Sequence, residues 1–220
     1  MDTQRLFAHF PEDIQTRLRS AAHVQTFEPG EPIFHQGMPA SAIYAVMRGR
    51  VKVVRVTPDG YESILCVRQS GEYFCPVPVL DGKAQLGTAI AMTETTILWL
   101  QSDVFHALCR EYPQLLSTVQ GDCLAEVRYL LNRLETFAFR NIRERLAISL
   151  LDEVRHQRIA ENVPIVLHMT QLELAGLVGA SRESVSRMLA QMEQDGVVEL
   201  RRGKVCICDL GKLRKIASFE

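Results

Sequence analysis

The sequence lacks the features that mark a membrane, secreted or catalytic protein. No apolar run approaches the roughly 18 residues that a membrane-spanning helix requires. The first residues, MDTQRLFAHFPED, carry charges in place of the apolar segment of a signal peptide. We find no Ser-His-Asp order, no P-loop and no HExxH motif. We therefore expect a cytoplasmic protein that has no membrane partner and is not an enzyme.

Cysteine is present but follows no pattern. No CxxC motif occurs among the six cysteines, which are Cys66, Cys75, Cys109, Cys123, Cys206 and Cys208. Scattered thiols without a disulfide framework are typical of a reduced, cytoplasmic protein. Cys206 with Cys208, and His106 with Cys109, have the spacing of two metal ligands. Each pair lacks the further ligands of a zinc site, so we expect packing roles.

The sequence also has no large excess of positive or negative charge, because its net charge is −1. Residues 140–220 carry a small excess of basic side chains, whereas residues 1–139 carry an acidic excess. This tilt is a weak indication of a basic C-terminal domain.

The first half of the chain is rich in short β-type runs separated by glycines. After a stretch of helical spacing from Leu6 to Ala22, the runs IYAVMRG, RVKVVRV, ESILCV and TAIAMTETTILWL follow. Pro58-Asp59-Gly60 is a turn signal, since proline presets φ and glycine takes the left-handed position. Many short strands with regular turns predict an all-β sandwich, barrel or roll.

From about Ser102 the apolar period becomes helical, and one long helix is predicted over about residues 111–138. Its apolar stripe consists of Leu116, Val119, Cys123, Val127, Leu130, Leu134 and Phe137. The stripe could pack on its own domain or form a seam with the same helix of a second copy. The length of roughly seven turns favours a parallel dimer. Asn141 is the expected N-cap of the next helix, with the boundary in the linker Thr136–Asn141.

The stretch MTQLELAGLVGASRESVSRMLAQMEQDGVVELRRGKVCI, residues 169–207, has the pattern of a helix-turn-helix followed by a β-hairpin. Thr170 and Glu173 form a capping box, and Ser181 is placed to cap the second helix. Ala175, Gly179 and Val185 have the spacing of the close crossing, the turn and the core anchor.

The second helix then presents the residue types that read a DNA major groove. Arginine contacts guanine in a bidentate manner and glutamate accepts from cytosine, so Arg182, Glu183, Ser186 and Arg187 are candidate base-reading residues. The hairpin tip supplies three cations for phosphate, which are Arg201, Arg202 and Lys204.

This order of parts resembles the cyclic AMP receptor protein/fumarate-nitrate reduction regulator (CRP/FNR) superfamily. FEPGEPIFHQGMPASAIYAVMRGRVKVVRVTPDGYESIL matches the family's glycine and strand pattern, and TQLELAGLVGASRESVSRML matches its DNA-binding signature. The resemblance implies an α+β fold with three parts. They are an N-terminal β-roll (a cupin-like jelly roll) as sensor domain, a long dimerisation helix, and a C-terminal winged helix-turn-helix. Domains are then expected at 1–138 and 139–220.

The resemblance also implies a homodimeric, sequence-specific transcription activator that contacts RNA polymerase. In the family an Arg-Glu pair and a later Arg read TGTGA-type half-sites, which fall here on Arg182, Glu183 and Arg187. The anaerobic branch uses Glu, Ser and Arg, which fall on Glu183, Ser186 and Arg187. Arg182 favours a TGTGA-type palindrome, with a TTGAT-type site as the alternative.

The stretch GEYFCPVPVLDG, residues 71–82, does not identify the effector. Two prolines there exclude regular sheet pairing, so an irregular structure is expected around Cys75. In cyclic-nucleotide members a Gly-Glu holds the ribose and an Arg-Ser meets the phosphate. Here Cys75-Pro76 stands at the first place, and Leu86-Gly87 or Gly87-Thr88 at the second. Cyclic AMP is therefore not expected, and Cys75, Pro76, Leu86 and Thr88 are candidate effector-pocket residues for an unidentified ligand.

Other branches of the family offer two more alternatives for Cys75. The iron–sulfur branch needs an N-terminal cysteine cluster, which residues 1–25 lack. Haem-dependent carbon-monoxide sensors carry the motif Gly-acidic-x-Phe-Cys, whose cysteine ligates iron. Gly71-Glu72-Tyr73-Phe74-Cys75 resembles this motif, and a thiolate is a normal haem ligand. However, Val77 stands where those sensors place a histidine, so a haem would need either another ligand, such as His35, or an open site. A redox-sensing thiol and a plain packing role for Cys75 also stay open.

Overall fold

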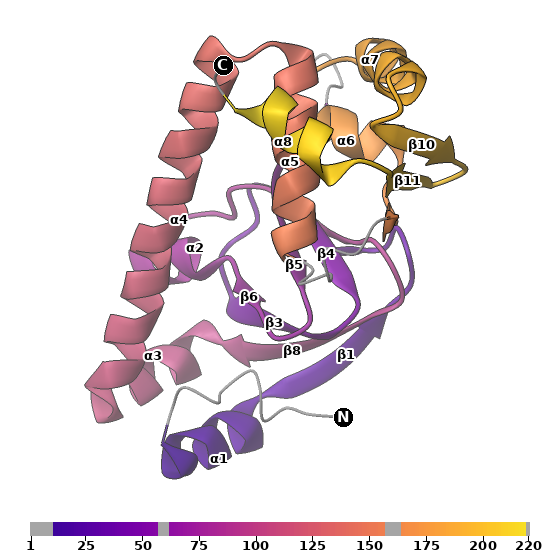
Figure 1. Cartoon of the computed structure of the whole chain (residues 1–220). Helices are drawn as coiled ribbons and strands as arrows, with labels where there is room; N and C mark the ends of the chain where they lie inside the picture. Colours follow the sequence, from indigo (N-terminus) through magenta and orange to yellow (C-terminus); the bar gives the residue numbers. More distant parts are fainter. Residues whose placement is uncertain (1–10, 57–61, 157–163, 219–220) are drawn as a thin grey trace. The chain divides into compact units, whose positions relative to one another are not determined.

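The computed structural model describes residues 11–56, 62–156 and 164–218, and it divides into two units, residues 1–128 and 129–220 (Figure 1). The turn predicted at Pro58-Asp59-Gly60 lies outside the described residues. In the described ranges, no helix combines the length and apolarity needed to cross a membrane.

The first unit contains two four-stranded antiparallel sheets. One has the order β1 (His23–Phe27), β8 (Thr95–Gln101), β3 (Ala42–Arg48), β6 (Tyr73–Phe74). The other has the order β2 (Pro32–Phe34), β7 (Thr88–Ala91), β4 (Arg50–Val56), β5 (Glu62–Gln69). A buried cluster joins residues of both sheets, including Val46 and Ile97 from the first and Val51, Val53, Ala89 and Ala91 from the second. The predicted β-roll is confirmed.

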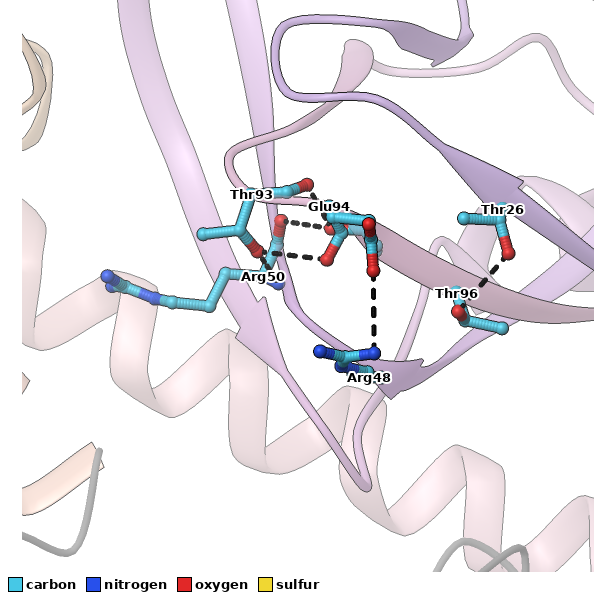
Figure 2. Close-up of polar contacts among 7 residues, drawn as sticks. Thr26, Arg48, Arg50, Thr93, Glu94 and Thr96 are labelled. Carbon is cyan, nitrogen blue, oxygen red and sulfur yellow. Dashed lines mark hydrogen bonds and ion pairs between the residues drawn. The ribbon is translucent and has the colours of Figure 1, made fainter. Parts of the chain in front are cut away.

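The turn from β3 to β4 packs tightly against the turn that precedes β8. The Arg50 backbone N–H donates to Thr93 Oγ1 (3.2 Å), and Arg48 forms an ion pair with Glu94 (3.4 Å; Figure 2). Thr26 and Thr96 place their hydroxyls 3.3 Å apart across β1 and β8 (Figure 2). These contacts close one end of the roll.

Helices cover the outer side of the first sheet. They are α1 (Glu12–Ala21), α3 (Ser102–Glu111) and the start of α4 (Pro113–Phe139), while α2 (Pro76–Asp81) follows β6. Leu100 of β8 lies in one buried cluster with Leu18, Phe105, Leu115 and Val119. The predicted long helix is confirmed as α4, although it runs through Phe139 and so includes most of the expected linker.

The second unit holds the remaining elements. They are α5 (Ile142–His156), β9 (Ile165–Leu167), α6 (Gln171–Val178), α7 (Arg182–Gln194), β10 (Val198–Arg201), β11 (Lys204–Ile207) and α8 (Leu210–Ala217). Asn141 caps α5 as predicted, because its Oδ1 accepts from the Glu144 N–H (3.1 Å). The hairpin gains β9 as a third strand, giving the order β10-β11-β9. Neither β9 nor α8 was expected from the sequence.

Candidate nucleic-acid interface and effector site

The α6–turn–α7 segment is built by local hydrogen bonds. The Glu173 N–H donates to Thr170 Oγ1 (3.2 Å) and the Thr170 N–H donates to Glu173 Oε2 (2.6 Å), which completes the predicted capping box. Gly179 ends α6 in the left-handed region at φ 60°, where a β-carbon costs energy. Ser181 then caps α7 by accepting from the Ser184 N–H (3.2 Å). The turn geometry is thus specified by residues close in sequence.

Helix α7 has one buried face and one polar face. Val185, Leu189 and Met192 are each fully buried in the core of the second unit. Of the four candidate base-reading residues, Ser186 is partly buried and the others, Arg182, Glu183 and Arg187, are exposed. Because residues three or four apart share a helix face, Ser186 lies on one face with both Arg182 and Glu183, and Arg187 on one face with Glu183, so these side chains can meet one groove together. Their contact with DNA remains a prediction.

The hairpin of β10 and β11 turns at Gly203, which has φ 69°. The three predicted cations at its tip are all exposed. Arg201 differs from the other two, because its Nε donates to Glu199 Oε1 (2.9 Å). This hydrogen bond holds the pKa of Glu199 below its usual value. Arg202 and Lys204 are therefore the better candidates for phosphate contact.

Two positioning contacts in the second unit could not be found from sequence spacing. Arg143 of α5 donates to Asp195 (2.7 Å), and Lys212 of α8 donates to the Asp195 carbonyl (3.0 Å). Asp195 is the C-cap of α7. Cations at a helix C-terminus are stabilising, so both contacts hold the end of the candidate reading helix.

The end of α4 packs against the helix-turn-helix turn. Arg133 donates to the Leu177 carbonyl (2.9 Å), and a β-carbon on Gly179 would lie 3.3 Å from Phe137 Cε1. The guanidinium groups of Arg133 and Arg145 lie 5.4 and 5.6 Å from the centre of the Phe137 ring. Phe137, expected in the dimer seam, is thus partly engaged within the second unit. Its role in the seam stays a prediction.

The irregular structure expected around Cys75 is present. Cys75 has φ 57° and ψ 41°, the left-handed region, between β6 and the first turn of α2. Among the residues that the structure describes, it is the only non-glycine residue with a positive φ. Its thiol packs beside the cluster that contains Phe34 and Phe74, with Cys66 and Tyr44 nearby. Burial, together with the nearby Cys66, raises the pKa of Cys75 to about 12. The thiol is therefore protonated near neutral pH, which favours packing over metal ligation or peroxide chemistry.

The loop from Cys75 to Thr88 offers little to a phosphate. Leu86 is 55% exposed, and Thr88 Oγ1 accepts from the Gln36 N–H (3.1 Å). Lys83 is the basic residue of this loop, and its exposed side chain lies 3.7 Å from Asp81. Pro76 has no N–H to donate. These residues do not fit a cyclic nucleotide, and their role in holding another effector remains a prediction.

The remaining metal candidates do not converge. Cys206 is buried whereas Cys208 is exposed, and the His106 Nε2 is 3.0 Å from the Val79 carbonyl. His35, the suggested second haem ligand, is exposed. The described ranges contain no group of three His, Cys, Asp or Glu side chains placed to hold a metal ion.

Two polar contacts join the roll to α4, and the sequence did not suggest them as functional. Arg68 of β5 donates to Glu126 (2.8 Å), and the Tyr73 hydroxyl of β6 donates to Asp122. Asp122 and Glu126 are four residues apart and so lie on one face of the helix.

Several solved structures share this fold. The c-di-GMP responsive global regulator CLP of Xanthomonas campestris matches with a TM-score of 0.81 at 20% identity, covering 90% of this chain and 100% of that chain. A CooA mutant from Carboxydothermus hydrogenoformans matches with a TM-score of 0.77 at 23% identity, covering 99% and 97%. At these identities the likeness shows the fold alone.

Sequence comparisons establish the family. A cyclic nucleotide-binding domain model matches residues 24–112, and a Crp-like helix-turn-helix domain model matches residues 144–216. The chain is 30% identical over 207 residues to the cyclic AMP receptor protein of Thermus thermophilus, covering 94% of this chain and 93% of that protein. It is 28% identical over 193 residues to a CRP-like cAMP-activated global transcriptional regulator of Mycobacterium tuberculosis, covering 87% and 86%. The chain therefore belongs to the CRP/FNR family of transcription regulators, with a β-roll of the cyclic nucleotide-binding type and a helix-turn-helix DNA-binding domain.

Proposed function

We propose that the protein is a cytoplasmic, homodimeric transcription activator that recruits RNA polymerase to TGTGA-type palindromes. The observation that carries this proposal is the polar face of α7, where Arg182, Glu183 and Arg187 are exposed on a helix whose other face is buried. Arginine and glutamate at the start of such a helix match guanine and cytosine in the major groove.

The half-site is tested by substituting Arg182. Arg182→Ala is expected to weaken binding to a TGTGA palindrome by about 1–3 kcal/mol, the usual value of one bidentate base contact. Fluorescence anisotropy with labelled TGTGA and TTGAT duplexes at fixed salt measures the change. Arg110→Ala, an exposed arginine of α3, is the matched control and should bind like wild type. Unchanged binding by Arg182→Ala, or equal affinity for both duplexes, would contradict the assignment.

Dimerisation through α4 is supported by an exposed apolar stripe. Val127, Leu130 and Leu134 are 51%, 44% and 64% exposed, and they recur at spacings of three and four residues. A parallel helix pair would bury them and supply the two-fold symmetry that a palindrome requires. Leu130→Glu should yield a monomer in analytical ultracentrifugation while leaving the fold intact by circular dichroism. A dimer that survives this change would place the seam elsewhere.

The input to the roll is proposed to be an effector other than a cyclic nucleotide, or the redox state of the roll. The haem alternative requires Cys75 as a thiolate, which its burial and its raised pKa disfavour. An absorption spectrum of the purified protein, taken before and after dithionite and carbon monoxide, distinguishes a haem sensor from a roll without haem. A Soret band that shifts with the gas and is lost in Cys75→Ala would establish haem, whereas a featureless spectrum would exclude it.

A further inference from the structure

Arg68 extends from the inner face of the roll to α4. It pairs with Val51 in the register of β4 and β5, and residues directly opposite each other in an antiparallel pair lie on the same face of a sheet. Val51 is fully buried between the two sheets. Cys66, two residues earlier, pairs in the same way with buried Val53. The guanidinium is therefore on the side of β5 that faces the roll interior.

The partner of Arg68 is an oxyanion supplied by the chain itself. Its Nη2 is 2.8 Å from Glu126 Oε2, and the two side chains are only 20% and 35% exposed. Its Nη1 also donates to the Val67 carbonyl (3.1 Å). Removing one partner of a partly buried pair is costly, because the other charge is then left without a counter-charge.

The second contact reinforces the first. The Tyr73 hydroxyl donates to Asp122 one helical turn before Glu126. Tyr73 belongs to β6, two residues before Cys75, so the contact connects α4 to the strand that leads into the candidate effector loop. The end of β5 and the start of β6, which are consecutive in the chain but belong to different sheets, are thus both bonded to one face of α4.

The loop and the ion pair together suggest how the roll works without a nucleotide. The candidate effector loop provides no buried cation for an anionic ligand, whereas the cation inside the roll already has a carboxylate partner from α4. We propose that Arg68–Glu126, supported by Tyr73–Asp122, takes the place of a small-molecule effector, holding α4 on the β-roll so that the ligand-free protein binds its DNA site. This inference rests on the DNA-binding part of the proposed function, leaves the redox state of the roll as its input in place of a small-molecule effector, and assigns Arg68 and Glu126 as positioning residues.

The test uses full-length protein freed of small molecules by unfolding, dialysis and refolding. Anisotropy with the TGTGA palindrome should show wild-type affinity that cyclic AMP does not change. Arg68→Met and Glu126→Gln should each weaken binding by about tenfold, within the usual range of coupling between sites. The exchange Arg68→Glu with Glu126→Arg should restore affinity to within about threefold of wild type, which is below that range. Arg17→Met is the matched control, since it removes an exposed ion pair of similar length, Arg17–Glu111 (2.9 Å).

The outcomes separate this inference from the function on which it rests. If no variant and no wild-type protein binds the palindrome, the proposed function fails. If wild-type protein binds but Arg68→Met and Glu126→Gln bind equally well, the inference alone is overturned. A requirement of the refolded wild-type protein for cyclic AMP would also overturn it. Glu126→Gln is nearly isosteric and should fold like wild type, and circular dichroism shows whether any lost affinity of this variant reflects lost folding. Failure of the exchange to restore binding in folded protein also counts against the inference.

Discussion

Gly49 joins β3 to β4 at a point where a side chain has no space. Its φ is 92°, and a β-carbon there would lie 2.5 Å from both the Glu94 carbonyl oxygen and Thr95 Oγ1. Glu94 belongs to the turn that Figure 2 shows beside Arg48 and Arg50, and Thr95 is the first residue of β8. Thr95 Oγ1 is 3.1 Å from the Arg50 carbonyl, so moving it away also breaks a hydrogen bond.

The cost of Gly49→Ala has two parts. A positive φ costs a residue with a β-carbon about 1–2 kcal/mol, and overpacking against the facing turn costs about 1–3 kcal/mol. We therefore expect the free energy of unfolding of the first unit to fall by about 2–5 kcal/mol. Gly30→Ala isolates the first part, because Gly30 has φ 87° and no atom within 4 Å of its added β-carbon.

Trp99 makes the measurement local. It is the sole tryptophan and pairs with Tyr44 across β8 and β3. Urea unfolding followed by its fluorescence therefore reports on the first unit and not on the helix-turn-helix. Equal losses for Gly49→Ala and Gly30→Ala, or a loss below about 1 kcal/mol for Gly49→Ala, would refute the steric argument.

Three further predictions concern single groups. Thr170→Val removes the capping acceptor of α6 and should lower the free energy of unfolding of the second unit by about 1 kcal/mol, whereas Thr170→Ser should not; equal behaviour in thermal unfolding would contradict the capping role. Gln85 is 3% exposed and neither amide atom has a hydrogen-bond partner among the described residues, so Gln85→Leu should raise stability by about 1–3 kcal/mol in urea, and a decrease would show that the amide is satisfied. The pKa of Cys75 is raised to about 12 when folded, so its contribution to stability is complete below the unfolded thiol's pKa and is lost as pH rises towards 12. Wild type should therefore lose more stability than Cys75→Ala over this alkaline range, and parallel curves would contradict the burial of the thiol.

Elements with strong local signals were predicted well. The valine-rich run became β4, and the Thr170 and Ser181 caps formed as expected because capping involves residues three apart. The proline-rich stretch after Cys75 left the sheet because proline cannot donate to a ladder. Strand β9 is three residues long and α8 is eight, too short for a clear period, so both escaped notice.

The face of the sheet on which a strand residue lies could not be predicted from the sequence in the same way. The register of β4 and β5 shifts between Val53 and Val54, and a slip of one residue moves every later side chain to the other face. Alternation along the sequence therefore could not place Arg68 inside the roll. Its partner Glu126 is 58 residues away, which no local pattern connects.

The sequence by itself determined the short β-strands, the long helix and the helix-turn-helix with Arg182, Glu183 and Arg187 on its second helix, because turns, caps and apolar periods are set by near neighbours. The choice of a roll over a sandwich or barrel came from the family resemblance. Tertiary structure decided which side chains from distant segments meet. It placed Phe137 against Gly179, put the Cys75 thiol in an apolar core that raises its pKa, and brought Arg68 to Glu126. Such contacts depend on register and packing across the sheets, and those are properties of the whole folded unit.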